Sequence, residues 1–345
     1  MAINLYDGLP RHGKTALMIN PNISGWLKDA AKYGLKVFSN VYIYGTSDFA
    51  MLISNDASST TTNVIVTGCL SDHSLGDGFH FGAISDATIS NCQAYYTGDD
   101  GLGIGDDGAV GRPATRIEVV NFQSMQAGNK AGGGTHGAGI RIFDGAVDVH
   151  ITGGAIYQSC EAGLAIGRFS STTAYNTRIV VNGLKVYQCL QQAGMYANMS
   201  FQWVNSLSVK DCWSEAPVSQ GCYAFLDCNN VTVTGNTAKD AVVRAFLTDD
   251  STTTNVAATW SNWTFIGNAC LGTPSNESYY FVPATGKTIT NLLITGNTET
   301  GQSSANYIST NRLAGTCKIN NNTSLGGKTI TNGGSGVAPT TTNNN

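Results

Sequence analysis

The sequence has little charge and little proline. Asp, Glu, Lys and Arg make up 12% of its 345 residues, and there are 7 prolines. With 41% hydrophobic residues, this composition excludes intrinsic disorder, which needs high net charge and few apolar residues. The net charge is −4 and no basic run is present, so we expect neither nucleic acid nor a membrane surface as a partner. Gly, Asn or a charge interrupts every apolar run before it could span a bilayer.

Paired cysteine motifs are also missing. The 9 cysteines are odd in number and show no C-x-x-C spacing, which argues against a disulfide framework and against a zinc ribbon. The N-terminus shows no basic segment followed by an apolar one, so no secretory signal peptide is predicted.

A short pattern recurs along most of the chain: apolar, any residue, apolar, polar, then Gly, Asn or Asp. The strict alternation is typical of strands with one buried face, and no helical pattern separates the copies. The pattern therefore predicts an all-β, single-stranded right-handed parallel β-helix over residues 46–325, with insertions confined to loops. Ten rungs are expected, with central residues Val66, Ile89, Val119, Ile151, Val181, Val209, Val233, Phe265, Ile294 and Ile319.

Two further columns follow from this register. The residue after each turn is often Cys or Asn, and stacked Asn side chains can form a buried ladder; these residues are Cys69, Cys92, Cys212, Asn236, Asn268, Asn297 and Asn322. A second strand in each rung should place one residue outward between two inward ones. That outward column is predicted as His80, Gly103, Arg141, Ala165, Tyr196 and Ala224. Small residues there would leave a groove, and Tyr196 would offer a face for stacking on a sugar.

The two ends differ from the middle. Residues 22–33 are predicted to form a short capping helix within an N-terminal segment, 1–45, and residues 326–345 a flexible tail. Gly8, Gly13, Lys14 and Thr15 fit the phosphate-loop pattern, and the first 45 residues resemble the start of zonula occludens toxin-like phage ATPases. The resemblance implies nucleotide binding at those four residues. No sheet with a Mg²⁺-binding Asp follows, so a complete nucleotide-binding domain is not expected, and a chance match or a recombined segment stays open.

Three carboxylates are predicted to cluster. Asp77 precedes the second strand of one rung, and Asp99 and Asp100 precede the equivalent strand of the next. Adjacent strands lie about 4.8 Å apart, so Asp77 and Asp100 should be neighbours. Neighbouring carboxyl groups push their pKa values apart, leaving one as a general acid and another as a base. Inverting glycoside hydrolysis uses such a pair about 6.5–9.5 Å apart.

These motifs resemble those of polygalacturonases. Asp77-Gly-Phe-His-Phe81 is similar to their Asn-Thr-Asp-Gly-Phe-Asp-Ile, and Asp99-Asp-Gly-Leu-Gly-Ile104 to their Asp-Asp-Cys-Leu-Ala-Ile. The resemblance implies a pectate-lyase-like fold and catalytic roles for Asp77, Asp99 and Asp100. The family's Gly-His-Gly and Arg-Ile-Lys are matched only in part: His136 lies two residues before the expected position, and Arg141-Ile-Phe143 lacks the lysine. Galacturonate recognition is therefore not implied.

Phage tailspikes and depolymerases share this fold. The resemblance implies a polysaccharide substrate, a homotrimer, and action outside the cell or on a virus particle released by lysis. The expected substrate contacts are His80, His136, Arg141, Asp106, Glu161, Arg168 and Tyr196. No cofactor or metal is predicted, although Asp106 and Asp107 leave a Ca²⁺ site open.

Three alternatives stay open. A polysaccharide lyase would use His80 or His136 as base and Arg141 to neutralise a uronate carboxyl. A non-catalytic glycan-binding or structural β-helix would bind without shortening the chain. Finally, Asp-Gly and Asp-Asp-Gly are common turn sequences, which would give the carboxylates a purely structural role.

Overall fold

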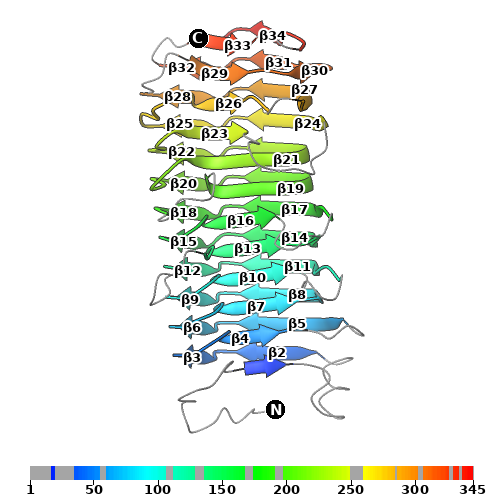
Figure 1. The fold of residues 1–345 in the computed structure, drawn as a ribbon, viewed down its shortest axis with the longest axis vertical. Coiled ribbons are helices and arrows are strands. Elements are labelled where there is room, and N and C mark those ends of the chain that lie inside the picture. Colours follow the sequence, from blue (N-terminus) through cyan, green and yellow to red (C-terminus); the bar gives the residue numbers. More distant parts are fainter. Residues whose placement is uncertain are drawn as a thin grey trace.

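The computed structural model describes residues 17–19, 35–54, 60–105, 112–128, 136–167, 174–190, 197–248, 259–283, 286–301, 306–325, 329–333 and 336–344. This part of the chain is an all-β parallel β-helix, and it contains no α-helix. Successive turns stack along one long axis, with residues 35–54 near one end and residues 336–344 at the other (Figure 1). The predicted capping helix, 22–33, lies outside the described residues. Within them, no helix has the length and hydropathy that crossing a membrane requires.

Each turn contributes strands to three faces, and all strand pairs are parallel. The first face, which carries the candidate site, consists of β1 (Leu17–Ile19), β4 (Met51–Ile53), β7 (Phe79–Gly82), β10 (Leu102–Gly105), β13 (Ile140–Phe143), β16 (Leu164–Gly167), the start of β19 (Ala197–Lys210), the start of β21 (Gly221–Thr234), β23 (Arg244–Thr248), β26 (Tyr279–Phe281), β29 (Asn306–Thr310) and β33 (Thr329–Asn332).

The second face carries the recurring sequence pattern. It consists of β2 (Lys36–Ser39), β5 (Thr61–Thr67), β8 (Ile84–Ser90), β11 (Thr115–Val120), β14 (Val147–Thr152), β17 (Asn176–Asn182), the ends of β19 and β21, β24 (Thr259–Ile266), β27 (Thr288–Thr295), β30 (Leu313–Ala314), β31 (Lys318–Asn320) and β34 (Thr340–Thr342). The first two faces are linked into one 23-stranded sheet, because β19 and β21 run continuously from one face to the other.

The third face is an 11-stranded sheet of very short strands. It consists of β3 (Tyr42–Tyr44), β6 (Leu70–Asp72), β9 (Gln93–Tyr95), β12 (Gln123–Met125), β15 (Ala155–Tyr157), β18 (Lys185–Tyr187), β20 (Trp213–Glu215), β22 (Thr237–Lys239), β25 (Ala269–Leu271), β28 (Thr298–Thr300) and β32 (Thr323–Ser324).

The predicted register of the second face is confirmed. Val66 pairs with Ile89, Ile89 with Val119, and the pairing continues in the predicted order to Ile319. A single residue with positive φ turns the chain from the second face to the third, for example Gly68 at 62° and Asn91 at 53°. Gly and Asn tolerate this left-handed conformation better than other residues, which explains why the pattern ends in Gly, Asn or Asp.

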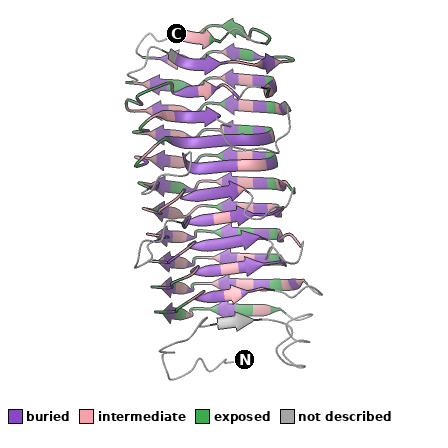
Figure 2. Ribbon diagram, in the orientation of Figure 1, coloured by how far each residue is buried: buried purple, intermediate pink, exposed green. Residues whose placement is uncertain are grey.

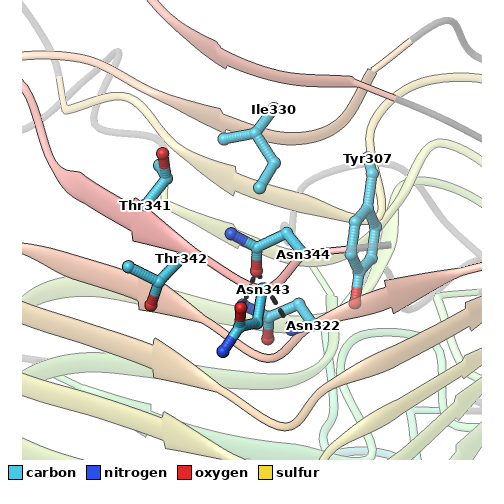
Figure 3. A pocket seen from close by; sticks show the side chains of 7 residues that line it. All are labelled: Tyr307, Asn322, Ile330, Thr341, Thr342, Asn343 and Asn344. Atoms are coloured by element: carbon cyan, nitrogen blue, oxygen red, sulfur yellow. Dashed lines mark hydrogen bonds between the residues drawn. The ribbon is translucent and has the colours of Figure 1, made fainter.

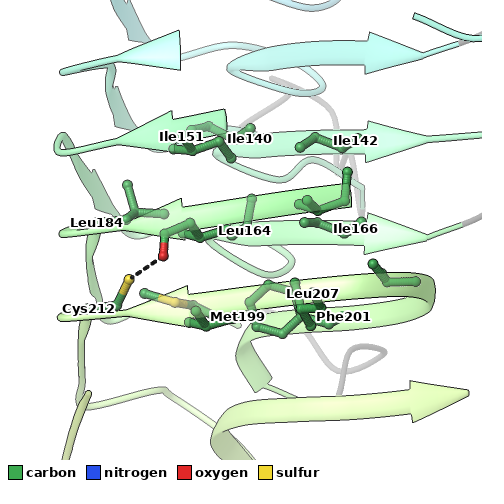
Figure 4. Close-up of a cluster of buried hydrophobic side chains, with 14 of the residues drawn as sticks. Ile140, Ile142, Ile151, Leu164, Ile166, Leu184, Met199, Phe201, Leu207 and Cys212 are labelled. Atoms are coloured by element: carbon green, nitrogen blue, oxygen red, sulfur yellow. Dashed lines mark hydrogen bonds between the residues drawn. The ribbon is translucent and has the colours of Figure 1, made fainter. Parts of the chain in front are cut away.

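The interior is a continuous column of apolar side chains. Figure 2 shows buried residues along nearly every turn, and Figure 4 shows Ile140, Leu164, Met199 and their neighbours stacking from one turn to the next. Buried cysteines take part in this core, and Cys212 Sγ lies 3.7 Å from the carbonyl oxygen of Val181. The cysteines are free thiols, as the missing motifs predicted.

The predicted asparagine ladder is present. Asn236 Nδ2 donates to Asn268 Oδ1 at 3.0 Å, Asn268 to Asn297 at 2.9 Å, and Asn297 to Asn322 at 2.9 Å. Each of these amides is buried, and each carbonyl oxygen also accepts a backbone N–H from the previous turn. The ladder therefore satisfies polar groups that the turn would otherwise leave buried without a partner.

β-Helix pairing extends beyond the predicted limits of 46 and 325. β2 and β3 pair with β5 and β6, while β33 and β34, within the segment predicted as a tail, pair with β29 and β31. The extra C-terminal turn forms because Asn344 continues the ladder, accepting from Asn322 Nδ2 at 3.1 Å. Thr and Asn replace apolar residues there, which removed the signal that marked the earlier turns.

A cavity of about 370 Å³ lies at this C-terminal end, lined by Tyr307, Asn322, Ile330, Asn344 and neighbouring Thr and Asn residues (Figure 3). It lies where the interior of the helix opens beyond its last turn. Its described lining includes no acid–base pair, and we assign it no function.

Candidate active site

Three aspartates converge at the N-terminal edge of β7 and β10. Phe79 pairs with Leu102, so Asp77 and Asp100, each two residues earlier, lie on adjacent turns as predicted. Asp100 N donates to Asp77 Oδ1 at 3.0 Å. One side-chain oxygen from each of Asp77, Asp99 and Asp100 lies within 4.8 Å of the others. Asp77 and Asp100 are buried, whereas Asp99 is partly exposed.

Asp77 is held against an imidazole. Its Oδ2 lies 2.6 Å from Nδ1 of His80, whose ring sits 4.9 Å from that of Phe49 and 6.1 Å from that of Phe143. Gly103 on the next turn leaves the space beside this pair open: a Cβ there would lie 3.0 Å from Asp77 Oδ2 and 3.2 Å from His80 Nδ1. Asp77 and His80 are therefore held in place, and Gly103, their neighbour in the outward column, does not cover them.

Asp100 is held from the next turns. It accepts the backbone N–H of Ala138 at 2.7 Å and Nε of Arg141 at 2.7 Å. Arg141 also donates through Nη2 to Glu161, and Glu161 in turn contacts Nδ1 of His136 at 2.9 Å. Arg141 is 12% exposed and His136 is 77% exposed. A chain of polar contacts thus runs from the buried Asp100 to the surface.

Burial and mutual repulsion separate the protonation states of the acids. Burial, and then the charges of Asp100 and Asp77, raise the pKa of Asp99 to about 7. Burial also raises the pKa of Asp100, to about 6, although the Arg141 guanidinium opposes this. Burial acts in the same direction on Glu161, but Arg141 and His136 outweigh it and leave the pKa of that carboxyl lowered. Asp99 is therefore the carboxyl best suited to carry a proton near neutrality.

A small recess adjoins the cluster at Arg141. It holds about 30 Å³ and is lined by Arg141, Phe143, Ala165, Gly167, Ser200 and Gln202, with Ile142 and Ile166 beneath. Sequence reasoning placed Tyr196 in the outward column of this turn, and that assignment was wrong. Ala165 pairs with Ser200, which is four residues further along the chain than the predicted outward residue.

Several predicted site residues lie outside the described residues. These are Asp106, Arg168, Tyr196 and the phosphate-loop residues Gly8, Gly13, Lys14 and Thr15. The described candidates His80, His136, Arg141 and Glu161 all join the aspartate cluster through hydrogen bonds.

A cation could in principle be held by the three aspartates, since hard cations favour clustered carboxylate oxygens. Both oxygens of Asp77 and both of Asp100 are already engaged, by the Asp100 amide, His80, Ala138 and Arg141. A metal ion would have to displace these partners, so the donor set does not fit a resident metal.

Sequence reasoning missed the aromatic walls around His80. Phe143 packs over Gly105, where a Cβ would lie 2.4 Å from the ring. Phe49 approaches from the preceding turn. In the sequence, Phe143 stands where polygalacturonases have lysine, and Phe49 precedes the first predicted rung. Neither position indicates that an aromatic ring lies against His80.

Comparison with solved structures shows the same fold in proteins of very different sequence. A protein of Geobacillus virus E2, ORF18, matches with a TM-score of 0.55 and 10% identity, covering 76% of this chain. This chain spans about half, 54%, of the viral protein. The catalytic unit of a GH87 α-1,3-glucanase from Streptomyces thermodiastaticus matches with a TM-score of 0.52 and 12% identity, covering 98% of this chain and 69% of the glucanase unit.

The A-module of a mannuronan C-5 epimerase from Azotobacter vinelandii matches with a TM-score of 0.51 and 15% identity, covering 96% of this chain and 90% of the module. No protein-family model matches the chain, and no curated protein matches it in sequence. The comparisons therefore place the chain among right-handed parallel β-helix proteins and show the fold alone.

Proposed function

We propose that this chain is a glycoside hydrolase of the phage tailspike or depolymerase type, which cuts a polysaccharide at the aspartate cluster. The observation that carries the proposal is the convergence of Asp77, Asp99 and Asp100 with one partly exposed, proton-holding member. Similarity in fold to a glucanase and a polysaccharide epimerase supports a carbohydrate substrate. The polygalacturonase-like motifs at the same three positions add support.

Asp99 acts as the general acid in this proposal. Its pKa near 7 keeps a useful fraction protonated at neutral pH, and its partial exposure lets it reach a glycosidic oxygen. Proton transfer from Asp99 Oδ to that oxygen allows the C–O bond to break. The side-chain oxygens of Asp77 and Asp100 stabilise the positive charge that develops on the sugar ring.

Water attacks the sugar carbon, and the product has inverted configuration. Asp77 and Asp100 are 6% and 7% exposed, and all their oxygens already accept hydrogen bonds, so neither is placed to bond covalently to a sugar carbon. They can still accept a proton from a small water molecule. One oxygen from each of the three aspartates lies within 4.8 Å of the others, a shorter distance than the roughly 6.5–9.5 Å typical of inverting enzymes. Inversion is therefore supported by the burial of Asp77 and Asp100 and not by the separation of the carboxyl groups.

A lyase finds less support. Such an enzyme needs a cation to neutralise the carboxylate of a uronate, and Arg141 was the candidate. Arg141 is buried and already paired with both Asp100 and Glu161. Of the two candidate bases, His80 is hydrogen-bonded to Asp77 and His136 to Glu161.

The test is incubation of the purified protein with a panel of bacterial capsular, O-antigen and plant polysaccharides. New reducing ends without ultraviolet absorbance from unsaturated sugars are expected, and a product of inverted anomeric configuration by proton NMR. Asp99→Asn should lower kcat by about 10²–10⁴-fold with its fold intact. Asp86→Asn, an exposed carboxyl on the second face, is the matched control and should keep full activity. Unsaturated products would show that the enzyme works by elimination and not by hydrolysis. Binding without chain shortening would show that the protein binds glycans without cutting them.

The proposal includes the setting in which the protein works. We expect it to act outside the cell or on a virus particle, as a homotrimer, and the shared fold of the Geobacillus virus E2 protein supports the viral setting. Light scattering of the purified protein tests the trimer directly.

A further inference from the structure

The candidate site concentrates negative charge. Four carboxyl groups, Asp77, Asp99, Asp100 and Glu161, are linked by hydrogen bonds or lie within 4.8 Å of one another. Among the described residues, their ion pairs involve one permanent cation, Arg141, and two imidazoles, His80 and His136. Even with both imidazoles protonated and Asp99 neutral, the cluster does not become positive.

The charge of Arg141 is already offset by two acids. Its Nε contacts both oxygens of Asp100, its Nη2 contacts Glu161, and the side chain is 12% exposed. A carboxylate on the substrate would be a third acid beside this single cation.

The described residues of the recess beyond Arg141 add no second charge. Besides Arg141 itself, the recess is lined by the hydroxyl of Ser200, the amide of Gln202, the ring of Phe143 and the small residues Ala165 and Gly167. Gln202 Nε2 donates to Ser200 Oγ at 3.4 Å, which leaves the amide carbonyl of Gln202 as an acceptor for a sugar hydroxyl. Hydroxyl and amide groups beside an aromatic ring are suited to neutral sugars.

From these charges we infer that the sugar unit at the cleaved bond carries no carboxylate: the substrate is a polysaccharide with a neutral or amino-sugar unit at that position. This inference rests on the proposed hydrolase function and names its substrate class. It departs from the polygalacturonases that the aspartate motifs resemble. A uronate at this position would meet a cluster of acids without net positive charge, whose one arginine is already paired with two of them, and like charges at close range oppose binding.

Chemically matched polymers provide the test. Wild-type protein and the Asp99→Asn variant are given several polyuronides, the same polyuronides after reduction of every carboxyl group to a primary alcohol, and a panel of neutral and amino-sugar glycans. Each matched pair differs in charge and not in linkage. Wild type should shorten the neutral member of any pair that it attacks at least about tenfold faster, and Asp99→Asn should bind that member more tightly.

Salt and a charge substitution sharpen the test. Any residual binding of a polyuronide should strengthen when sodium chloride is raised, because screening weakens repulsion, while neutral-glycan binding should not change. Gln202→Lys places a cation in the recess and should raise activity on polyuronides relative to neutral glycans. Ser208→Lys, on the same strand but on the second face, is the matched control and should leave that ratio unchanged.

The outcomes separate the inference from the function on which it rests. Faster cleavage of an unreduced polyuronide than of its reduced partner overturns the inference while hydrolysis stands. A failure of both proteins to shorten or bind any polymer in the panel overturns the proposed function, and the substrate class with it.

Discussion

Replacement of Arg141 by methionine should destabilise the protein far more than the loss of one ion pair at the surface would. Methionine keeps most of the apolar stem but removes the guanidinium that sits between Asp100 and Glu161. Those side chains are 7% and 13% exposed, so both acids would be left buried without the guanidinium, and Asp100 without any permanent cation. Breaking a buried pair in this way costs about 3–5 kcal/mol, because the desolvated charge that remains has no compensation.

The loss should depend on pH in a defined direction. In the folded wild type the pKa of Asp100 is already raised to about 6, so the folded state binds more protons than the unfolded chain between about pH 4 and 6. Stability contributed at this residue therefore falls as pH rises through that window. Without Arg141, which opposes the rise, the pKa would climb further and the fall would be steeper. The difference between variant and wild type should be smaller at pH 5 than at pH 8.

Urea unfolding at both pH values, followed by tryptophan fluorescence, measures this difference. The matched control is Arg178→Met, which breaks the exposed pair between Arg178 and Asp148 on the second face and should cost at most about 1 kcal/mol at either pH. Equal losses for the two variants, or an Arg141→Met loss that does not change with pH, would refute the assignment of Arg141 as the counter-ion of a buried acid.

Three further results are expected. Asp99→Asn should raise the free energy of unfolding by about 1–2 kcal/mol at pH 8, discounted for partial exposure, and should change little at pH 4. The folded-state pKa near 7 lies above the ordinary value of this carboxyl, so the wild type loses stability as pH rises from about 4 to 7 and the full loss is present at pH 8. Thermal unfolding at the two pH values checks this, and a loss of stability at pH 8 would contradict it. Asn268→Ala should cost about 2–4 kcal/mol, because Asn236 and Val233 lose buried partners. Asn262→Gly in the exposed ladder, where the positive φ of 59° suits glycine, should cost less than about 1 kcal/mol. Calorimetry distinguishes them, and similar losses would count against the buried ladder. Chelation with EDTA should leave cleavage rate and melting temperature unchanged, and a decrease that Ca²⁺ restores would establish a metal site instead.

Much of this fold can be predicted from the sequence because two local rules repeat in phase. Alternating apolar residues set which side chains face inward, and one residue with positive φ ends each strand of the second face. Both rules act within about five residues, so insertions elsewhere in a turn do not disturb them. The same rules explain why the last turn was missed: its strand, Thr340–Thr342, has no apolar residue to report the alternation.

The first face was harder, because its strands follow loops of unequal length. The Asp77 and Asp100 alignment was predictable since the strand starts there with the same Asp-Gly step on both turns. In the turn after that of Ala165, a similar sequence beginning with Gly lies four residues before the register that the structure shows. The sequence therefore predicts Tyr196 as the outward residue, whereas the structure places Ser200 there. Local sequence identifies such a strand but does not state where in a long connection it begins.

The role of Arg141 could not be predicted from any local pattern. Its outward position was predicted, and an outward arginine beside a carboxylate cluster suggests a substrate contact. Its actual role depends on Glu161, which precedes the next strand of the first face and extends back toward the guanidinium. In a β-helix, hydrogen-bonded backbones hold neighbouring turns at one spacing, so a side chain interacts with the columns above and below it more than with its sequence neighbours. The electrostatics of this site are consequently a property of four successive turns, and the charge that a substrate meets follows from their combination.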